Sequence, residues 1–186
     1  RRLLLVLGDQ LDYERFLPAD FHQDSDLFWM TEASEESTHV RSNKHRIVCF
    51  LAAMRHFRNH LQKEKIPLLY HELSDGDSTL GGWLSQDLAQ LKPEIVSVVQ
   101  PGDHRVEQSL AEVCRDAGVA LELREDEHFL CSQSEFEDHA RGRKSLRMEF
   151  FYREMRRKHD VLMDGKDPIG GAWNFDKDNR ESFGKQ

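Results

Sequence analysis

A carboxylate and an amide, Asp9 and Gln10, follow Gly8 at the end of the first apolar run of the chain. That run, residues 3–7, has the length and unbroken apolar character of a strand buried on both faces of a parallel sheet. Asp9 can accept hydrogen bonds and Gln10 can donate and accept them, which suits a neutral, hydroxyl-rich ligand better than a phosphate. The alternative interpretation is that Asp9 only caps the turn that follows.

Other catalytic and cofactor-binding patterns are absent from the sequence. A single glycine followed by Asp9 lacks the three glycines of a dinucleotide fingerprint, and the chain has neither a Walker A loop nor a G-x-S-x-G elbow. His56 and His60 have the i, i+4 spacing of metal ligands, but no H-E-x-x-H pattern accompanies them, and chance is the better explanation among ten histidines. We interpret Cys131 as a small buried hydrophobic residue and not as a metal ligand beside His128. We predict no metal site.

The composition is that of a compact soluble protein with one domain and a tail. The chain has 186 residues, of which 38% are hydrophobic and 32% charged, and a mean hydropathy of -0.70. No segment approaches the roughly 18 consecutive apolar residues that a membrane span needs. Three widely spaced cysteines, Cys49, Cys114 and Cys131, do not form a disulfide framework and indicate a reducing compartment. We therefore expect a cytoplasmic protein without a membrane partner.

Charge is distributed unevenly along the chain. The formal net charge of the chain is -8. Residues 141–158 hold eight basic residues and only two acidic ones, Glu149 and Glu154, so this segment has a net charge of +6. The remainder of the chain therefore carries -14. This segment also has a helical spacing of Met148, Phe151, Tyr152 and Met155. It is either an amphipathic helix with a solvated basic face or a surface that meets a phosphate backbone or an acidic partner.

Strand and helix patterns alternate over the first two thirds of the chain. Strands are predicted at 3–7, 25–31, 68–73, 95–99 and 119–123, and helices at 44–63, 80–91 and 106–117. This alternation predicts an α/β fold: a Rossmann-like, open, mainly parallel five-stranded sheet with helices on both faces. Helices at 132–140 and 146–158 follow, no further strand is expected, and residues 164–186 form an extended C-terminal connector.

Ligands of open parallel sheets bind beyond the carboxyl ends of the strands, where the strand order reverses. In this chain those ends are residues 8–10, residues 32–36 and residues 101–103. They predict a pocket that is acidic and lined by glycine.

Several strings occur in an order that is specific to one protein family. They are Leu5-Val6-Leu7-Gly8-Asp9-Gln10-Leu11, residues 52–57, Pro101-Gly102-Asp103-His104-Arg105-Val106, residues 142–157 and residues 170–180. Together they make the chain similar to the N-terminal part of the deoxyribodipyrimidine photolyase-related proteins, which include the bacterial iron-sulfur (6-4) photolyases and cryptochromes. The similarity extends over essentially the whole chain.

The resemblance implies an antenna and scaffold domain of a FAD-dependent, photolyase-like lyase or a blue-light receptor. Residues 1–131 would form the α/β antenna domain and residues 132–186 a helical segment and connector. FAD and a 4Fe-4S cluster would belong to a flavin domain outside this chain, so the chain alone would be a non-catalytic fragment. The antenna pigment implied is 6,7-dimethyl-8-ribityllumazine. Its expected contacts are Gly8, Asp9, Gln10, Glu32, Glu36, Phe50, Pro101 and Gly102, with Asp9 and Glu36 as the main hydroxyl acceptors.

The connector carries the expected contact with damaged DNA. Asp176 and Arg180 match positions that approach the lesion in members of the family, where an arginine would neutralise phosphate and an aspartate would accept a hydrogen bond. Alternatively, both residues only hold the connector against the flavin domain, which is the second partner that the resemblance implies. The second hypothesis for the whole chain is a free-standing Rossmann-like binding protein or enzyme for a small hydroxylated ligand.

Overall fold

The computed structural model describes residues 1–76 and 79–176. The chain divides into two compact units, Arg1–Glu125 and Asp126–Gln186, and each is described by itself. The division predicted after residue 131 lies inside the second unit. No helix in the described ranges is long and apolar enough to cross a membrane.

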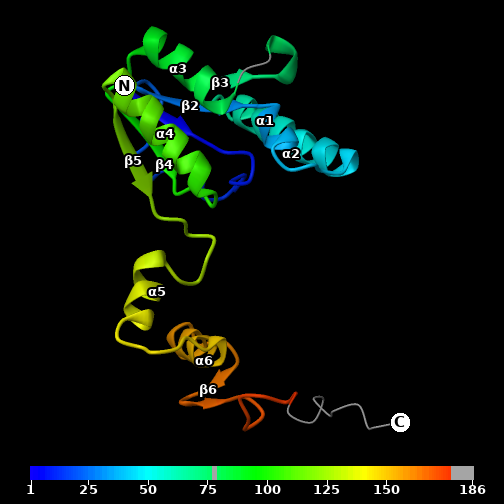
Figure 1. Ribbon diagram of the computed structural model, residues 1–186, viewed down its shortest axis with the longest axis vertical. Helices are drawn as coiled ribbons and strands as arrows, with labels where there is room; N and C mark the ends of the chain where they lie inside the picture. Colours follow the sequence, from blue (N-terminus) through cyan, green and yellow to red (C-terminus); the bar gives the residue numbers. More distant parts are fainter. Residues whose placement is uncertain (77–78, 177–186) are drawn as a thin grey trace. The chain divides into compact units, whose positions relative to one another are not determined.

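The first unit is built on a five-stranded, all-parallel sheet (Figure 1). Its strands are β1 (Arg2–Leu5), β2 (Asp26–Thr31), β3 (Leu68–His71), β4 (Ile95–Val99) and β5 (Ala120–Arg124). They lie in the order β3-β2-β1-β4-β5, and every neighbouring pair is parallel. The central strand β1 is buried on both faces, as its continuous apolar run predicts. The predicted Rossmann-like α/β fold is confirmed.

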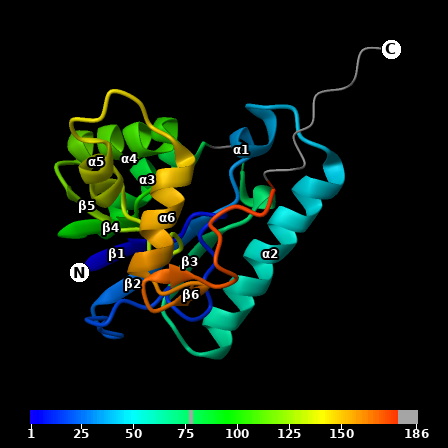
Figure 2. The ribbon, with the colours of Figure 1, turned by 90° about the horizontal axis from the view of Figure 1, so that it is seen from below.

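Helices cover both faces of this sheet. They are α1 (Glu35–Thr38), α2 (Lys44–Lys63), the 3-10 turn η1 (Leu73–Asp75), α3 (Leu80–Leu91) and α4 (His104–Ala117). Leu4 and Val6 of the first strand segment pack with the α2 residues Met54, Phe57 and Leu61. Leu3 and Leu5 pack in the core formed with α3 and α4 on the other face. Figure 2 shows α2 and the α3–α4 pair on opposite sides of the sheet.

Polar side chains cap the N-termini of the three long helices of this unit. Asn43 accepts a hydrogen bond from the His45 N–H, Thr79 from the Gly82 N–H, and Asp103 from the Arg105 N–H, so each caps the helix that follows it. Only the second half of the predicted apolar face of α2 is buried in the core. Met54, Phe57 and Leu61 are buried, whereas Phe50 is 37% exposed. The first half of α2 therefore presents its apolar side to a cavity rather than to the sheet.

The second unit pairs two helices with a short hairpin. Helices α5 (Gln133–Ala140) and α6 (Met148–Lys158) are followed by the strands β6 (Met163–Asp164) and β7 (Asp167–Pro168), which pair in antiparallel fashion. The expectation that no strand follows residue 126 was wrong. Gly165 adopts a φ of 59° in the two-residue turn, and this left-handed conformation lets so short a hairpin close.

Aromatic contacts and a partly buried side-chain hydrogen bond hold α5 against α6. The Phe151 ring meets the Phe136 ring edge to face at 5.2 Å and the His139 ring edge to face at 5.0 Å. His139 is buried, and its Nδ1 lies 2.6 Å from a carboxylate oxygen of Glu154. The second unit therefore has a small core of its own.

Candidate ligand-binding site

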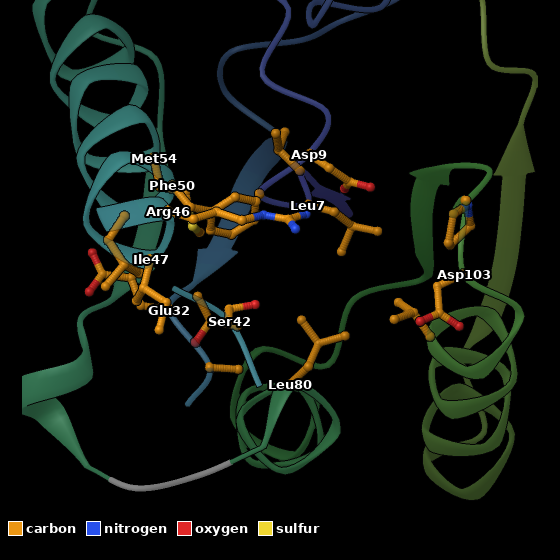
Figure 3. A pocket seen from close by; sticks show the side chains of 18 residues that line it. Leu7, Asp9, Glu32, Ser42, Arg46, Ile47, Phe50, Met54, Leu80 and Asp103 are labelled. Atoms are coloured by element: carbon orange, nitrogen blue, oxygen red, sulfur yellow. The ribbon is translucent and has the colours of Figure 1, made fainter. Parts of the chain in front are cut away.

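A cavity of about 290 Å³ lies at the carboxyl edge of the sheet, where the strand order reverses beside β1 (Figure 3). Its walls come from the ends of β1, β2 and β4, the first half of α2, and the first residues of α3 and α4. This is the place where open parallel sheets bind their ligands. Six of the residues predicted for the site line it: Gly8, Asp9, Glu32, Phe50, Pro101 and Gly102.

Gly8 is required by the close approach of α2. A Cβ atom at this position would lie 2.4 Å from the Phe50 ring atom Cζ and 2.9 Å from the Met54 sulfur. The absence of a side chain lets the Phe50 ring lie against the backbone and form one wall of the cavity. At Gly102 a Cβ would meet nothing within 4 Å, so the opposite wall is open.

The Gly8→Ala substitution is expected to lower the free energy of unfolding by about 1–3 kcal/mol, because the new methyl group displaces Phe50 and Met54 from a packed position. The matched control is Gly102→Ala, which we expect to stay within about 0.5 kcal/mol of the unsubstituted protein. Urea denaturation of both variants measures the difference. Equal stabilities would show that the Phe50 and Met54 side chains rotate away from the new methyl group without cost.

Asp9 and Gln10, which are adjacent in the sequence, have different roles. Asp9 is exposed and lines the cavity, so its carboxylate is available to a ligand. Gln10 does not line the cavity. Its Nε2 donates to the backbone oxygens of Val99, at 2.9 Å, and Gln100, at 3.3 Å, which ties the loop after β1 to the end of β4. Gln10 thus positions the loop that carries Asp9.

Glu32 lines the cavity, but its carboxylate is already engaged. The side chain is fully buried and accepts hydrogen bonds from Arg55 Nε at 2.7 Å, Arg55 Nη2 at 2.8 Å, the Tyr70 hydroxyl at 2.7 Å and the Leu73 N–H at 3.1 Å. Burial alone would raise the pKa of Glu32, but these hydrogen bonds and the Arg55 charge outweigh it, and the pKa is lowered. In this structure Glu32 connects α2 to the strand ends and holds the cavity wall in place.

The lowered pKa of Glu32 predicts a loss of stability in acid. The contribution is fully present above the ordinary pKa of about 4.5 and is lost as the pH falls through the lower pKa of the folded state, because the unfolded chain takes up the proton first. We expect Glu32→Gln to flatten the decline of the free energy of unfolding below about pH 4.5. Urea midpoints between pH 7 and pH 3 test this, and parallel curves for both proteins would contradict it.

Arg46 lines the cavity as well, although it was not predicted from the sequence. It lies in the first turn of α2 and points into the cavity (Figure 3). Its spacing of four from Phe50 puts both residues on one helix face, and that spacing is the signal that was available in the sequence. The first turn of α2 contains Lys44 and His45 as well and no acidic residue. Arg46 therefore places a positive charge at one side of a cavity that has Asp9 in its lining.

Two further polar groups belong to the cavity lining. Thr31, at the end of β2, is 6% exposed, and its hydroxyl has no hydrogen-bond partner within the described part of the chain. A buried hydroxyl without a partner is uncommon and is satisfied when a polar ligand or water reaches it. Asp103 lines the cavity while its Oδ1 accepts from the Arg105 N–H at 2.8 Å.

The other predicted site residues lie partly beyond what the structure describes. Glu36 is in α1, but its side chain is outside the described residues. Its neighbour Glu35 accepts a hydrogen bond from the Leu80 N–H at 2.8 Å and so joins α1 to the start of α3. In the second unit Asp176 is exposed, and its N–H donates to Asn174 Oδ1 at 2.8 Å. Arg180 is outside the described residues.

The histidines and cysteines form no cluster with this cavity. His60 has its ring 5.0 Å from Tyr13, in an aromatic contact. Burial raises the pKa of Cys114 to about 11, so this thiol stays protonated at neutral pH and acts as a small hydrophobic side chain. Within residues 1–76 and 79–176, no group of three or more His, Cys, Asp or Glu side chains is placed to hold a metal ion.

A comparison with protein-family models gives a match over almost the whole chain. The model for deoxyribodipyrimidine photo-lyase-related proteins matches residues 4–186. The chain belongs to this photolyase-related family. The resemblance seen in the sequence is therefore confirmed over nearly the whole chain.

Two curated proteins are similar to this photolyase-related chain. The (6-4) photolyase of Agrobacterium fabrum (strain C58 / ATCC 33970) is 37% identical over 182 residues, which are 97% of this chain and 36% of that protein. An uncharacterized protein of Acanthamoeba polyphaga mimivirus is 23% identical over 192 residues, covering 98% of this chain and 95% of the viral protein. The chain thus spans about a third of the photolyase and nearly all of the viral protein.

Proposed function

We propose that this photolyase-related chain is the antenna and scaffold domain of a light-dependent DNA photolyase-like protein. The observation that carries the proposal is the cavity at the strand-order reversal, which combines the Asp9 carboxylate, the Arg46 guanidinium and the Phe50 ring. The pigment proposed for it is 6,7-dimethyl-8-ribityllumazine, which has a flat polar ring and a polyhydroxyl tail.

The lining of the cavity supports this class of ligand. Asp9 would accept hydrogen bonds from ribityl hydroxyls, Phe50 would lie along the ring, and Arg46 would donate to ring oxygens. The unpartnered Thr31 hydroxyl offers one more hydrogen bond. A volume of about 290 Å³ is at the lower end of the range for small-molecule sites, which suits a two-ring pigment rather than a whole dinucleotide.

The light-driven step would take place outside residues 1–186. FAD and a 4Fe-4S cluster are proposed for a flavin domain that follows the connector, and the reaction proposed for the intact protein is repair of (6-4) photoproducts in DNA. Asp176 and Arg180 are proposed to approach the damaged strand from the connector. The name of the Agrobacterium relative, a (6-4) photolyase with 37% identity, supports this reaction over photoreception alone.

Identification of the pigments in the natural protein tests the proposal. The protein is isolated from its own source under dim light and denatured, and the released compounds are separated and weighed by mass spectrometry. We expect FAD together with 6,7-dimethyl-8-ribityllumazine. Recovery of neither compound would reject the antenna proposal.

The alternative is a free-standing binding protein for a hydroxylated ligand, and one observation favours it. The mimivirus relative is matched over 95% of its own length, so a protein of about this size has the same sequence pattern. In that case the isolated protein would release a hydroxylated small molecule without any FAD.

A further inference from the structure

The side chains of α6 form a second charged feature, remote in sequence from the cavity residues. Three arginines of α6 surround one indole ring, with the guanidinium carbons of Arg153, Arg156 and Arg157 at 5.4, 5.2 and 4.6 Å from the centre of the Trp173 ring. We call these four residues the Arg–Trp cluster. The arginines are spaced at i, i+3 and i+4, so they share one face of the helix.

The positive charge of the Arg–Trp cluster is only partly neutralised. Arg153 forms an ion pair with Glu149. Arg156 is 7% exposed and donates from Nε to the Val161 carbonyl at 3.0 Å, and from Nη2 to the Leu162 carbonyl. Among the described residues, no carboxylate forms an ion pair with Arg156 or with Arg157. Two positive charges therefore remain beside one ring.

Such a gathering of charge is unfavourable in the free protein. Guanidinium groups about 5 Å from one ring centre repel one another, and Arg156 has lost most of its contact with water. Interaction with the faces of Trp173 and Tyr152 offsets part of this cost. An anion bound at the cluster would offset the rest, and Arg157 is exposed and accessible to one.

We infer that the Arg–Trp cluster binds the phosphodiester backbone of DNA. Guanidinium groups present paired N–H donors that match phosphate oxygens, and here they are already positioned by stacking and by backbone carbonyls. Lys144 and Arg147, just before α6, extend the basic sequence. A DNA strand has one phosphate for every 3.4 Å or so of helix axis, so it supplies anions along this whole segment.

An acidic protein partner fits the cluster less well. A peptide would need several acidic side chains in sequence to meet the same row of charges, whereas a DNA strand carries one anion at every nucleotide. The negative charge of the rest of the chain limits the affinity for a duplex, so we expect weak, salt-sensitive binding. This inference rests on the proposal that the substrate is DNA, and it adds the surface that holds the undamaged backbone.

The test is binding of residues 1–186 to a fluorescein-labelled, undamaged duplex, followed by anisotropy at several salt concentrations. Arg157→Gln is expected to weaken binding about fivefold at low salt and to reduce the slope of log K against log salt by about 1. Arg157→Lys should keep the slope and lose part of the affinity. The matched control is Arg115→Gln in α4, whose side chain is 70% exposed and which should change neither quantity.

Two results would overturn the inference. One is equal affinity and slope for Arg157→Gln and Arg115→Gln, which would show that the duplex does not bind at the Arg–Trp cluster. The other is tighter binding of a labelled polyglutamate peptide than of the duplex, which would assign the cluster to an acidic partner. Pigment retention, measured on the same samples, reports separately on the proposed antenna function, since none of these substitutions touches a cavity residue.

Discussion

Glu32→Ala is expected to lower the free energy of unfolding by about 3 kcal/mol. The substitution removes a fully buried carboxylate that joins α2, through Arg55, to Tyr70 of β3 and to the Leu73 N–H. Arg55 is 43% exposed, so water would solvate its charge, but the buried donors would lose their acceptor. Urea denaturation at pH 7 gives the value.

The control for this prediction is another glutamate of the same unit. Glu94 is 87% exposed and pairs with the N-terminal ammonium group, so Glu94→Ala should change stability by no more than about 0.5 kcal/mol. If Glu32→Ala also stayed within that range, the ion pair with Arg55 would be a surface feature without a structural role, and our description of the cavity wall would be wrong.

Removal of two carboxylates, Asp9→Ala with Glu36→Ala, is expected to weaken binding of 6,7-dimethyl-8-ribityllumazine about a hundredfold or more. Each hydrogen bond from a hydroxyl to a charged acceptor contributes roughly 1.5–3 kcal/mol, and every 1.4 kcal/mol is a factor of ten in affinity. Asp9 was chosen because its exposed carboxylate lines the cavity. Glu36 was chosen because it follows β2 in the sequence, at the same edge of the sheet. Fluorescence titration of both proteins measures the ratio.

The removal of one carboxylate outside the cavity tests for a general electrostatic effect. Asp116→Ala removes a carboxylate that is 78% exposed and lies at the other end of α4, away from the cavity lining. We expect its pigment affinity to match that of the unsubstituted protein. A loss as large as that of the double variant would show that net charge, rather than hydrogen bonding in the cavity, controls binding.

The sheet and the cavity position follow from patterns that are local in the sequence. Apolar runs predicted β1, β2 and β4, because strands buried on both faces lack a polar side. The strand ends then identified Gly8, Asp9 and Pro101 as neighbours, since parallel strands bring their carboxyl ends to one edge. The cap residues Asn43 and Asp103 mark where the helices beyond that edge begin.

What the sequence did not predict depends on contacts between distant residues. Glu32 looks like a free acceptor until Arg55 and Tyr70, 23 and 38 residues away, are seen to occupy its oxygens. The reach of Arg46 into the cavity depends on how far α2 extends past the sheet. Trp173 belongs to the segment predicted as an extended connector, yet the chain turns back after α6, so that the ring lies among three arginines.

The antenna proposal is tested most directly by an equilibrium titration of residues 1–186 with 6,7-dimethyl-8-ribityllumazine, followed by the fluorescence anisotropy of the pigment. We predict a saturable rise in anisotropy with one pigment for each chain, and a much weaker response for the Asp9→Ala, Glu36→Ala variant. Saturable binding that is the same in both proteins would place the pigment outside this cavity. The absence of any saturable change would contradict the antenna function itself.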